Sequence, residues 1–224
     1  FLNWYFSNAE QTNSDNFGTD ARQKAGTNTR MEIAKTAAVT LVNSMANTRL
    51  GLATYNGASG ALIREGLDDI DANKSDVIAA INGITGSGST PIAESMEEIG
   101  RYFVEGFEAN DITLHPGAGN ETTKAASSVF SHSPQYSNAS DKPTSANPAI
   151  QEFCQKNFLV AVTDGRPQND QDVDDDLIDY DGDCDGASPA CATFDQKTTG
   201  GYGYESSGSD YMDDVAQALY EIDL

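Results

Sequence analysis

Blocks of apolar and polar residues alternate along the chain, and their periods predict helices and strands in turn. The first helix is expected after Thr29, which forms a capping pair with Glu32. Two short apolar runs, 49–55 and 61–67, flank an Asn-Gly pair and predict two strands joined by a turn. A second helix is predicted over 74–83, with a glycine at its end. The expected apolar face of the first helix consists of Ala34, Ala37, Ala38, Leu41 and Met45.

The same alternation continues further along the chain. A Gly/Ser loop runs into Pro91, which is well tolerated at the first position of a helix, so Thr90 is expected at that helix's N-terminus. The apolar run Phe158–Val162 lacks alternation, as expected of a central parallel strand covered on both faces. A last helix is predicted over 209–224. The expected apolar faces are Ile92, Met96, Ile99 and Phe103 for the helix after Pro91, and Met212, Val215, Ala216 and Leu219 for the last helix.

Helices that alternate with strands predict an α/β fold with a doubly wound, mostly parallel sheet. We interpret residues 1–224 as one domain with two long polar insertions, at about 108–147 and 166–208. In such sheets ligands bind beyond the carboxyl ends of the strands, where Asp164 follows the run Phe158–Val162. An aspartate that only caps the following Asp-Gly turn is the alternative.

Charge narrows the classes of partner. The 224 residues include 35 acidic and 13 basic side chains, and the net charge of −22 repels nucleic acid and anionic membranes while favouring cations. No run approaches the roughly 20 apolar residues of a membrane helix, so no membrane span is expected in this segment. Few lysines, many small polar residues and the closely spaced Cys184 and Cys191 indicate an extracellular protein. A disulfide between these two cysteines is expected, and two free thiols are the alternative.

The stretch from Asp164 to Asp195 is strongly acidic, with eleven aspartates and a single basic residue, Arg166. Part of it follows a D-x-D-x-D-G pattern, as in the first half of a calcium loop. Ala192 stands where a regular EF-hand has its last glutamate ligand, so the loop is not an EF-hand. A bound Ca²⁺ ion and a solvated acidic loop both remain compatible with this pattern. The candidate calcium ligands are Asp179, Asp181, Asp183 and Asp185.

Two segments, "GSTPIAES" and "VTDGRP", resemble two of the three parts of the metal-ion-dependent adhesion site of von Willebrand factor A domains. The stretches "FLNWYFSNA", "TRMEIAKTAAVTLV", "CQKNFLVAVTDGRP", "DYDGD" and "YMDDVAQALYEIDL" occur in an order that resembles the A domain of PilY1-type proteins of bacterial type IV pili. The resemblance implies a Rossmann-like sheet, Thr90 and Asp164 as ligands of Mg²⁺ or Mn²⁺, and a place on the cell surface at the pilus tip.

The family's third part, a D-x-S-x-S segment, does not occur in the 224 residues. The resemblance would place it just upstream of Phe1, and the family continues with strands after the last helix. We therefore expect an A domain that is truncated at both ends and completed by the remainder of a longer polypeptide. The metal site, as given, is expected to be partial.

The resemblance implies an adhesion or assembly domain that binds pilus minor subunits or host-surface proteins with acidic groups through its divalent ion. A structural spacer of the pilus tip, with a calcium-stabilised loop, is the alternative. An enzyme is not expected, because nucleophilic catalysis needs a base beside its nucleophile and both histidines, His115 and His132, lie in the polar insertion. No phosphate-binding glycine loop occurs either.

Overall fold

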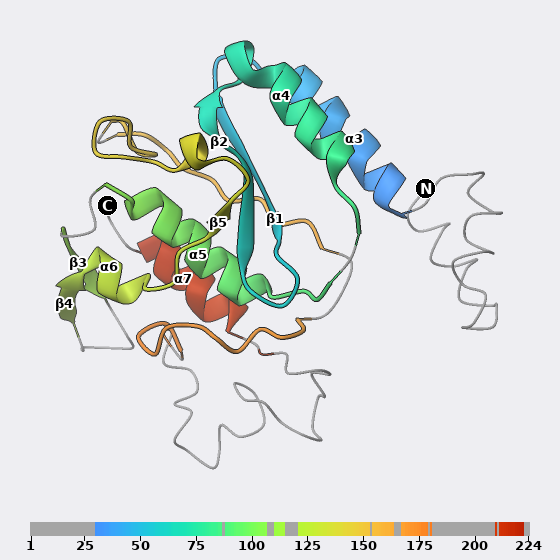
Figure 1. Ribbon diagram of the computed structural model, residues 1–224. Helices are drawn as coiled ribbons and strands as arrows, with labels where there is room; N and C mark the ends of the chain where they lie inside the picture. The colour runs from blue at the N-terminus through green and yellow to red at the C-terminus, as the bar shows by residue number, and fades with distance from the viewer. Residues whose placement is uncertain are drawn as a thin grey trace, which may run out of the picture. The chain divides into compact units, whose positions relative to one another are not determined.

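A computed structural model describes residues 30–86, 88–106, 110–114, 121–152, 154–163, 167–178, 180, 209 and 211–221. They form a mixed α/β structure with several helices and small sheets (Figure 1). The chain divides into two compact units, which are Phe1–Leu50 with Asp68–Gly86, and Gly51–Leu67 with Ser87–Leu224.

The first unit contains two packed helices, α3 (Arg30–Ser44) and α4 (Ile70–Gly83), and both were predicted from the sequence. Asp69 caps α4, because its side chain accepts a hydrogen bond from the backbone N–H of Asp71 at 2.9 Å. A lysine on each helix reaches the other helix or its end. Lys35 Nζ donates to the carbonyl of Asn82 at 2.7 Å, and Lys74 Nζ donates to the carbonyl of Met45 at 2.8 Å.

The predicted apolar face of α3 is only partly correct. Leu41 is 58% exposed, whereas Val42, which the prediction left out, is buried. The two lysine hydrogen bonds turn Lys35 and Met45 towards α4, and Val42 follows the same helical spacing. The predicted face consists mainly of alanines, which offer little apolar area to bury. The face that carries the larger side chain of Val42 packs against α4 instead.

The second unit contains most of a three-stranded sheet in the order β1-β2-β5. The predicted strand pair is confirmed as β1 (Arg49–Tyr55) and β2 (Ala61–Asp69), joined by a turn at residues 56–60. The short strand β5 (Gln135–Tyr136) runs parallel to β2 and pairs Gln135 with Leu62. A second sheet consists of β3 (Asp111–Leu114) and β4 (Thr122–Ala125), which pair in antiparallel register.

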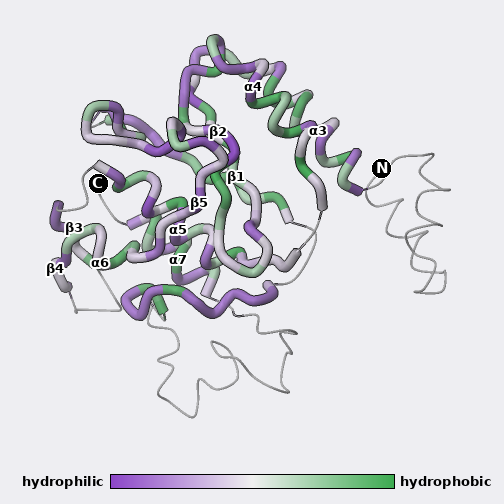
Figure 2. Tube along the Cα trace, in the orientation of Figure 1, coloured by the Kyte–Doolittle hydropathy of each residue, from purple (hydrophilic) through white to green (hydrophobic). Residues whose placement is uncertain are grey.

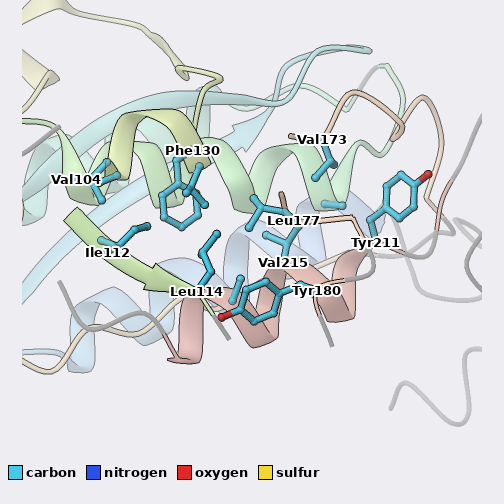
Figure 3. Close-up of a cluster of buried hydrophobic side chains, with 13 residues drawn as sticks. Val104, Ile112, Leu114, Phe130, Val173, Leu177, Tyr180, Tyr211 and Val215 are labelled. Carbon is cyan, nitrogen blue, oxygen red and sulfur yellow. The ribbon is translucent and has the colours of Figure 1, made fainter. Parts of the chain in front are cut away.

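Helix α5 (Ile92–Val104) lies between two apolar clusters of the second unit. Towards the sheet, Tyr102 packs with Ile63, and its hydroxyl accepts a hydrogen bond from the backbone N–H of Leu67 at 2.7 Å. On another side, α5 contacts α7 (Met212–Glu221) and α6 (Ala126–Val129). The larger cluster, shown in Figure 3, includes Val104, Ile112, Leu114, Phe130, Val173, Leu177, Tyr180, Tyr211 and Val215.

The buried faces of α5 and α7 differ from the apolar faces that were expected for these two helices. The single apolar face predicted for α5 is too narrow, since the helix buries residues around most of its circumference, including Ala93, Gly100 and Tyr102. The helix α7 is confirmed, but its buried face contains Val215 and Ala218, while Met212 is 42% exposed. No residue of α5 is exposed, so a one-sided pattern describes it poorly, whereas α7 keeps a solvent face that includes Tyr220.

The described part of segment 108–147 is not a surface insertion outside the core, so that prediction is wrong there. It contributes β3, β4, α6, β5 and a 3₁₀ turn at Ala139–Asp141. Ile112 is 2% exposed, and Phe130 is fully buried between α5 and its neighbours. The many small polar residues of this segment concealed a few well-spaced apolar residues that fill the larger cluster.

The apolar run Phe158–Val162 is not a strand in this structure, contrary to the prediction. It has no regular secondary structure, and the side chains of Phe158, Val160 and Val162 are 81%, 77% and 78% exposed. A central strand needs hydrogen-bonding strands on both sides, and among the described residues no strand pairs with this run. The continuous apolar sequence gives the propensity for a buried strand but not the neighbours that would bury it.

Candidate functional site

Helix α5 begins after a loop, residues 88–91, that is held by the turn between β1 and β2. Gly88 has a φ of 98°, and a Cβ atom built on it would lie 2.8 Å from the Cα atom of Gly57. The backbone N–H of Ser89 donates a hydrogen bond to the carbonyl of Gly57 at 3.0 Å. Only glycine combines this backbone conformation with so close an approach, so the local sequence fixes the path into the helix.

Thr90 lies at the N-terminus of α5, as predicted. Its carbonyl accepts a hydrogen bond from the backbone N–H of Ile92 at 3.0 Å, which closes a three-residue turn around Pro91. Thr90 is partly exposed, and among the described residues its hydroxyl has no hydrogen-bond partner.

The segment that follows Asp164 crosses the same end of α5. The backbone N–H of Gln168 donates to the carbonyl of Thr90 at 3.0 Å. Asp164 itself lies outside the described residues, and the contact with Thr90 is made by Gln168, four residues further along the chain. Figure 2 shows that the stretch 167–178 is mainly hydrophilic. The structure therefore brings the loop at 88–91 into contact with the chain just after the predicted carboxylate.

Two further residues of this segment fasten it to the helix. The side-chain amide of Asn169 donates to Ser89 Oγ at 2.5 Å. Asp170 is fully buried, and its carboxylate accepts hydrogen bonds from the backbone N–H of Glu94 at 3.1 Å and from the hydroxyl of Ser209 at 3.3 Å. Burial raises the pKa of Asp170 to about 6, although the N–H groups it binds act in the opposite direction. Asp170 is the cap that Pro91 cannot provide.

Glu94 fastens two other chain segments to the first turn of α5. Its carboxylate accepts hydrogen bonds from the backbone N–H of Gly60 at 3.2 Å, of Gln171 at 2.9 Å and of Asp172 at 3.0 Å. The residue is 7% exposed, and burial raises the pKa of its carboxyl group. A single side chain thus connects the turn before β2 with the segment after Asp170.

Glu97 and Glu98 continue this pattern along the helix. Glu97 is fully buried and accepts hydrogen bonds from the Nδ1–H of His132 at 2.8 Å and from the backbone N–H of Asp174 at 3.0 Å. Glu98 accepts a hydrogen bond from the backbone N–H of Ala61. Burial raises the pKa of both carboxyl groups, and that of Glu98 to about 7. His132 is thus paired with the carboxylate of Glu97.

Sequence reasoning missed these carboxylates because glutamates on a helix ordinarily face water. The usual expectation pairs Glu97 with Arg101, four residues further on. In the structure Arg101 instead lies 3.4 Å from Glu105. The only signal in the sequence is the spacing of Glu94, Glu97 and Glu98, which places three like charges on one side of the helix.

Acidic side chains gather around the N-terminal half of α5. The exposed N–H groups at a helix N-terminus carry a partial positive charge that by itself attracts anions. Here Asp170, Glu94, Glu97 and Glu98 surround the first two turns, and among the described residues no lysine or arginine forms an ion pair with them. Because burial raises the pKa of all four carboxyl groups, their total negative charge depends on pH near neutrality.

The remaining predicted site residues are outside the described part of the chain. Within the described part, no group of three or more His, Cys, Asp or Glu residues is placed to hold a metal ion, and Cys154 is an exposed free thiol. None of the helices described combines the length and the apolar character that a bilayer span requires. The residues outside the description are Asp164, Asp179, Asp181, Asp183, Asp185, Cys184, Cys191 and His115.

Comparison with known proteins adds no relative. No family model, no curated protein and no solved structure matches the chain.

Proposed function

We propose that the chain is a von Willebrand factor A-like domain of a type IV pilus-associated surface protein, and that it binds its ligand through a divalent ion at the N-terminus of α5. The observation that supports this proposal is the hydrogen bond between Gln168 and Thr90. It joins "GSTPIAES" to the residue that directly follows "VTDGRP", and the sequences of these two segments resemble the adhesion site. The finer fold, a doubly wound and mostly parallel sheet, belongs to the same proposal; among the described strands, the short pairing of β2 with β5 is parallel.

The donor groups fit a hard divalent cation. Thr90 offers a hydroxyl without a partner among the described residues, and Asp164 would add a carboxylate from the neighbouring segment. Mg²⁺ or Mn²⁺ held by these two residues would supply positive charge and an open position for an acidic group of the partner. The protein's part is to fix the two segments side by side, which Gln168 and Asp170 do through the helix end.

The acidic loop forms a separate part of the proposal. Asp179, Asp181, Asp183 and Asp185 would bind Ca²⁺, and a disulfide between Cys184 and Cys191 would close the loop around them. Bound Ca²⁺ would relieve the repulsion between carboxylates that alternate along the chain. The proposed partners are pilus subunits or host-surface proteins with acidic groups, and the proposed location is the bacterial surface, with no enzymatic activity.

A structural spacer of the pilus tip is the second candidate, and the carboxylates of α5 favour it. Glu94, Glu97 and Glu98 all bind backbone N–H groups, which is a fastening role and not one of ligand recognition. In this alternative the domain transmits force and only the acidic loop binds an ion.

The two candidates differ in what the substitutions Thr90→Val and Asp164→Ala do in the full-length protein. The adhesion proposal predicts that each variant is displayed on pili but loses most surface adhesion or pilus assembly. Asp175→Ala removes an exposed aspartate from the same unit and is the matched control. Unchanged adhesion and assembly in both site variants would exclude the adhesion proposal and leave the spacer.

A further inference from the structure

We propose that helix α5 carries a proton-responsive clasp, in which Glu94, Glu97 and Glu98 hold the turn before β2 and the segment 170–174 more tightly in mildly acidic than in alkaline solution. We call these three side chains, with His132, the α5 clasp. The segment that it holds continues directly from the chain beside Thr90.

The geometry of the clasp is a set of carboxylates that bind the backbone. The turn is held twice, by the N–H of Gly60 on Glu94 and the N–H of Ala61 on Glu98. The acidic segment is held by the N–H groups of Asp172 and Asp174, on Glu94 and Glu97. In these contacts the glutamates bind backbone N–H groups, and the side chain of Asp170 adds one contact from the held segment to the backbone N–H of Glu94.

The charges that face these glutamates are almost all negative. Glu98 faces Glu94 and Glu97 on its own helix, and Asp170 and Asp172 face Glu94 from the acidic segment. The cation that faces them is His132, which follows α6 and lies between Glu97 and Asp172. Its Nδ1 is 2.8 Å from Glu97, and its Nε2 is 3.8 Å from Asp172. Asp174 contributes a further negative charge near the same ring.

Protons therefore stabilise this arrangement. Burial, followed by repulsion from Glu97 and Glu94, raises the pKa of Glu98 to about 7, so that this carboxyl takes up a proton near neutrality. Burial acts to lower the pKa of His132, but Glu97, Asp172 and Asp174 outweigh it and raise the pKa above its ordinary value. On acidification Glu98 loses its charge while His132 gains one, and both changes reduce the repulsion within the clasp.

Hydrogen exchange of individual backbone amides tests the clasp directly. We expect protection at the amides of Ala61, Asp172 and Asp174, corrected for the intrinsic exchange rate, to rise as the pH falls from about 8 to about 5.5. The rise should be about 10-fold larger than at Val77 in α4, which corresponds to one pKa unit of differential proton binding. Protection that stays constant or falls on acidification at these three amides would overturn the inference.

Glu98→Gln imitates the protonated state and keeps an acceptor for Ala61. We expect this variant to be more protected than the wild type at the alkaline pH and to lose most of the pH difference. Glu152→Gln, at an exposed glutamate of the same unit, is the matched control and should behave as the wild type. An undiminished pH difference in Glu98→Gln, or an equal loss in the control, would contradict the clasp.

A titration of His132 by NMR tests the same arrangement in the unmodified protein. The wild-type imidazole should titrate above the ordinary pKa of histidine, and Glu97→Gln should bring the pKa down. A wild-type pKa below the ordinary value would overturn the inference even if the Glu98 variant did not fold. The clasp involves neither Thr90 nor Asp164, so its failure and the failure of the proposed metal site can be told apart.

Discussion

Gly60 has a left-handed backbone conformation and lies against the partly buried carboxyl group of Glu98. Its φ is 54°, and a Cβ atom there would lie 2.2 Å from the carboxyl carbon of Glu98. We expect Gly60→Ala to lower the free energy of unfolding by about 2–3 kcal/mol, through backbone strain and displacement of Glu98.

Gly57→Ala is the matched control for this substitution. Gly57 has a φ of 65°, but a Cβ atom there would meet nothing within 4 Å, so only the backbone strain of about 1 kcal/mol should remain. Urea denaturation of both variants measures the difference. Equal losses would show that Glu98 does not occupy the space beside Gly60.

Asp170 is the residue that fastens the acidic segment to the start of α5. Its replacement by alanine leaves the N–H of Glu94 and the hydroxyl of Ser209 without their acceptor, so we expect a loss of about 1–2 kcal/mol in the free energy of unfolding. Asp175→Ala, at an exposed residue in the same segment, should change it by less than about 0.5 kcal/mol. Similar losses in the two variants, measured by chemical denaturation, would contradict the capping role.

For single residues, the sequence predicted the place in the secondary structure better than it predicted the contacts of the side chain. Thr90 could be placed at a helix N-terminus because Pro91 and the preceding Gly/Ser loop are local signals. The inward direction of Glu94, Glu97 and Glu98 could not be predicted, because it depends on segments up to 78 residues away in the chain, such as Asp172. Local patterns carry no information about which distant N–H groups a carboxylate will meet.

At the scale of elements, short-range signals again decided what could be predicted. The β1–β2 pair, the end of α4 and the last helix follow from turn residues and periodicity. The strands β3 and β4 were missed because each has only four residues, with weak apolar patterning. The strand predicted at Phe158–Val162 shows the opposite error, in which strong β propensity lacks a pairing partner.

The exposure of this run gives a prediction at the same scale. Val160→Ala should leave the free energy of unfolding within about 0.5 kcal/mol of the wild type, because Val160 is 77% exposed. The same substitution at Val215, which is fully buried in α7, should cost about 1–3 kcal/mol through lost burial and a cavity. A loss at Val160 as large as that at Val215 would show instead that the run is a buried strand.

At the scale of the whole molecule, the net charge of −22 and the buried carboxylates both make stability depend on pH. The pKa of Glu98 is raised from 4.5 to about 7 and that of Asp170 from 3.8 to about 6, in each case mainly by burial. The stability that each group contributes is complete below its ordinary pKa and is lost as the pH rises through the raised value.

We therefore expect the thermal unfolding midpoint to rise as the pH falls from about 8 to about 5.5. Salt distinguishes the pH dependence that comes from surface charge from the part that comes from buried carboxyl groups, because about 0.5 M NaCl screens exposed charges but has little effect on buried ones. Most of the rise should persist in that salt and should diminish in Glu98→Gln. A pH dependence that salt removes entirely would assign it to surface charge alone.

The measurement that tests the central claim most directly is a calorimetric titration of Mn²⁺ and Mg²⁺ into the wild-type chain, Thr90→Val, Asp164→Ala and Asp175→Ala. We predict weak binding, at about millimolar affinity, to the wild type and to Asp175→Ala, and its loss in both site variants. Binding that Thr90→Val and Asp164→Ala leave unchanged, or no binding to the wild type, would contradict a metal site at the N-terminus of α5.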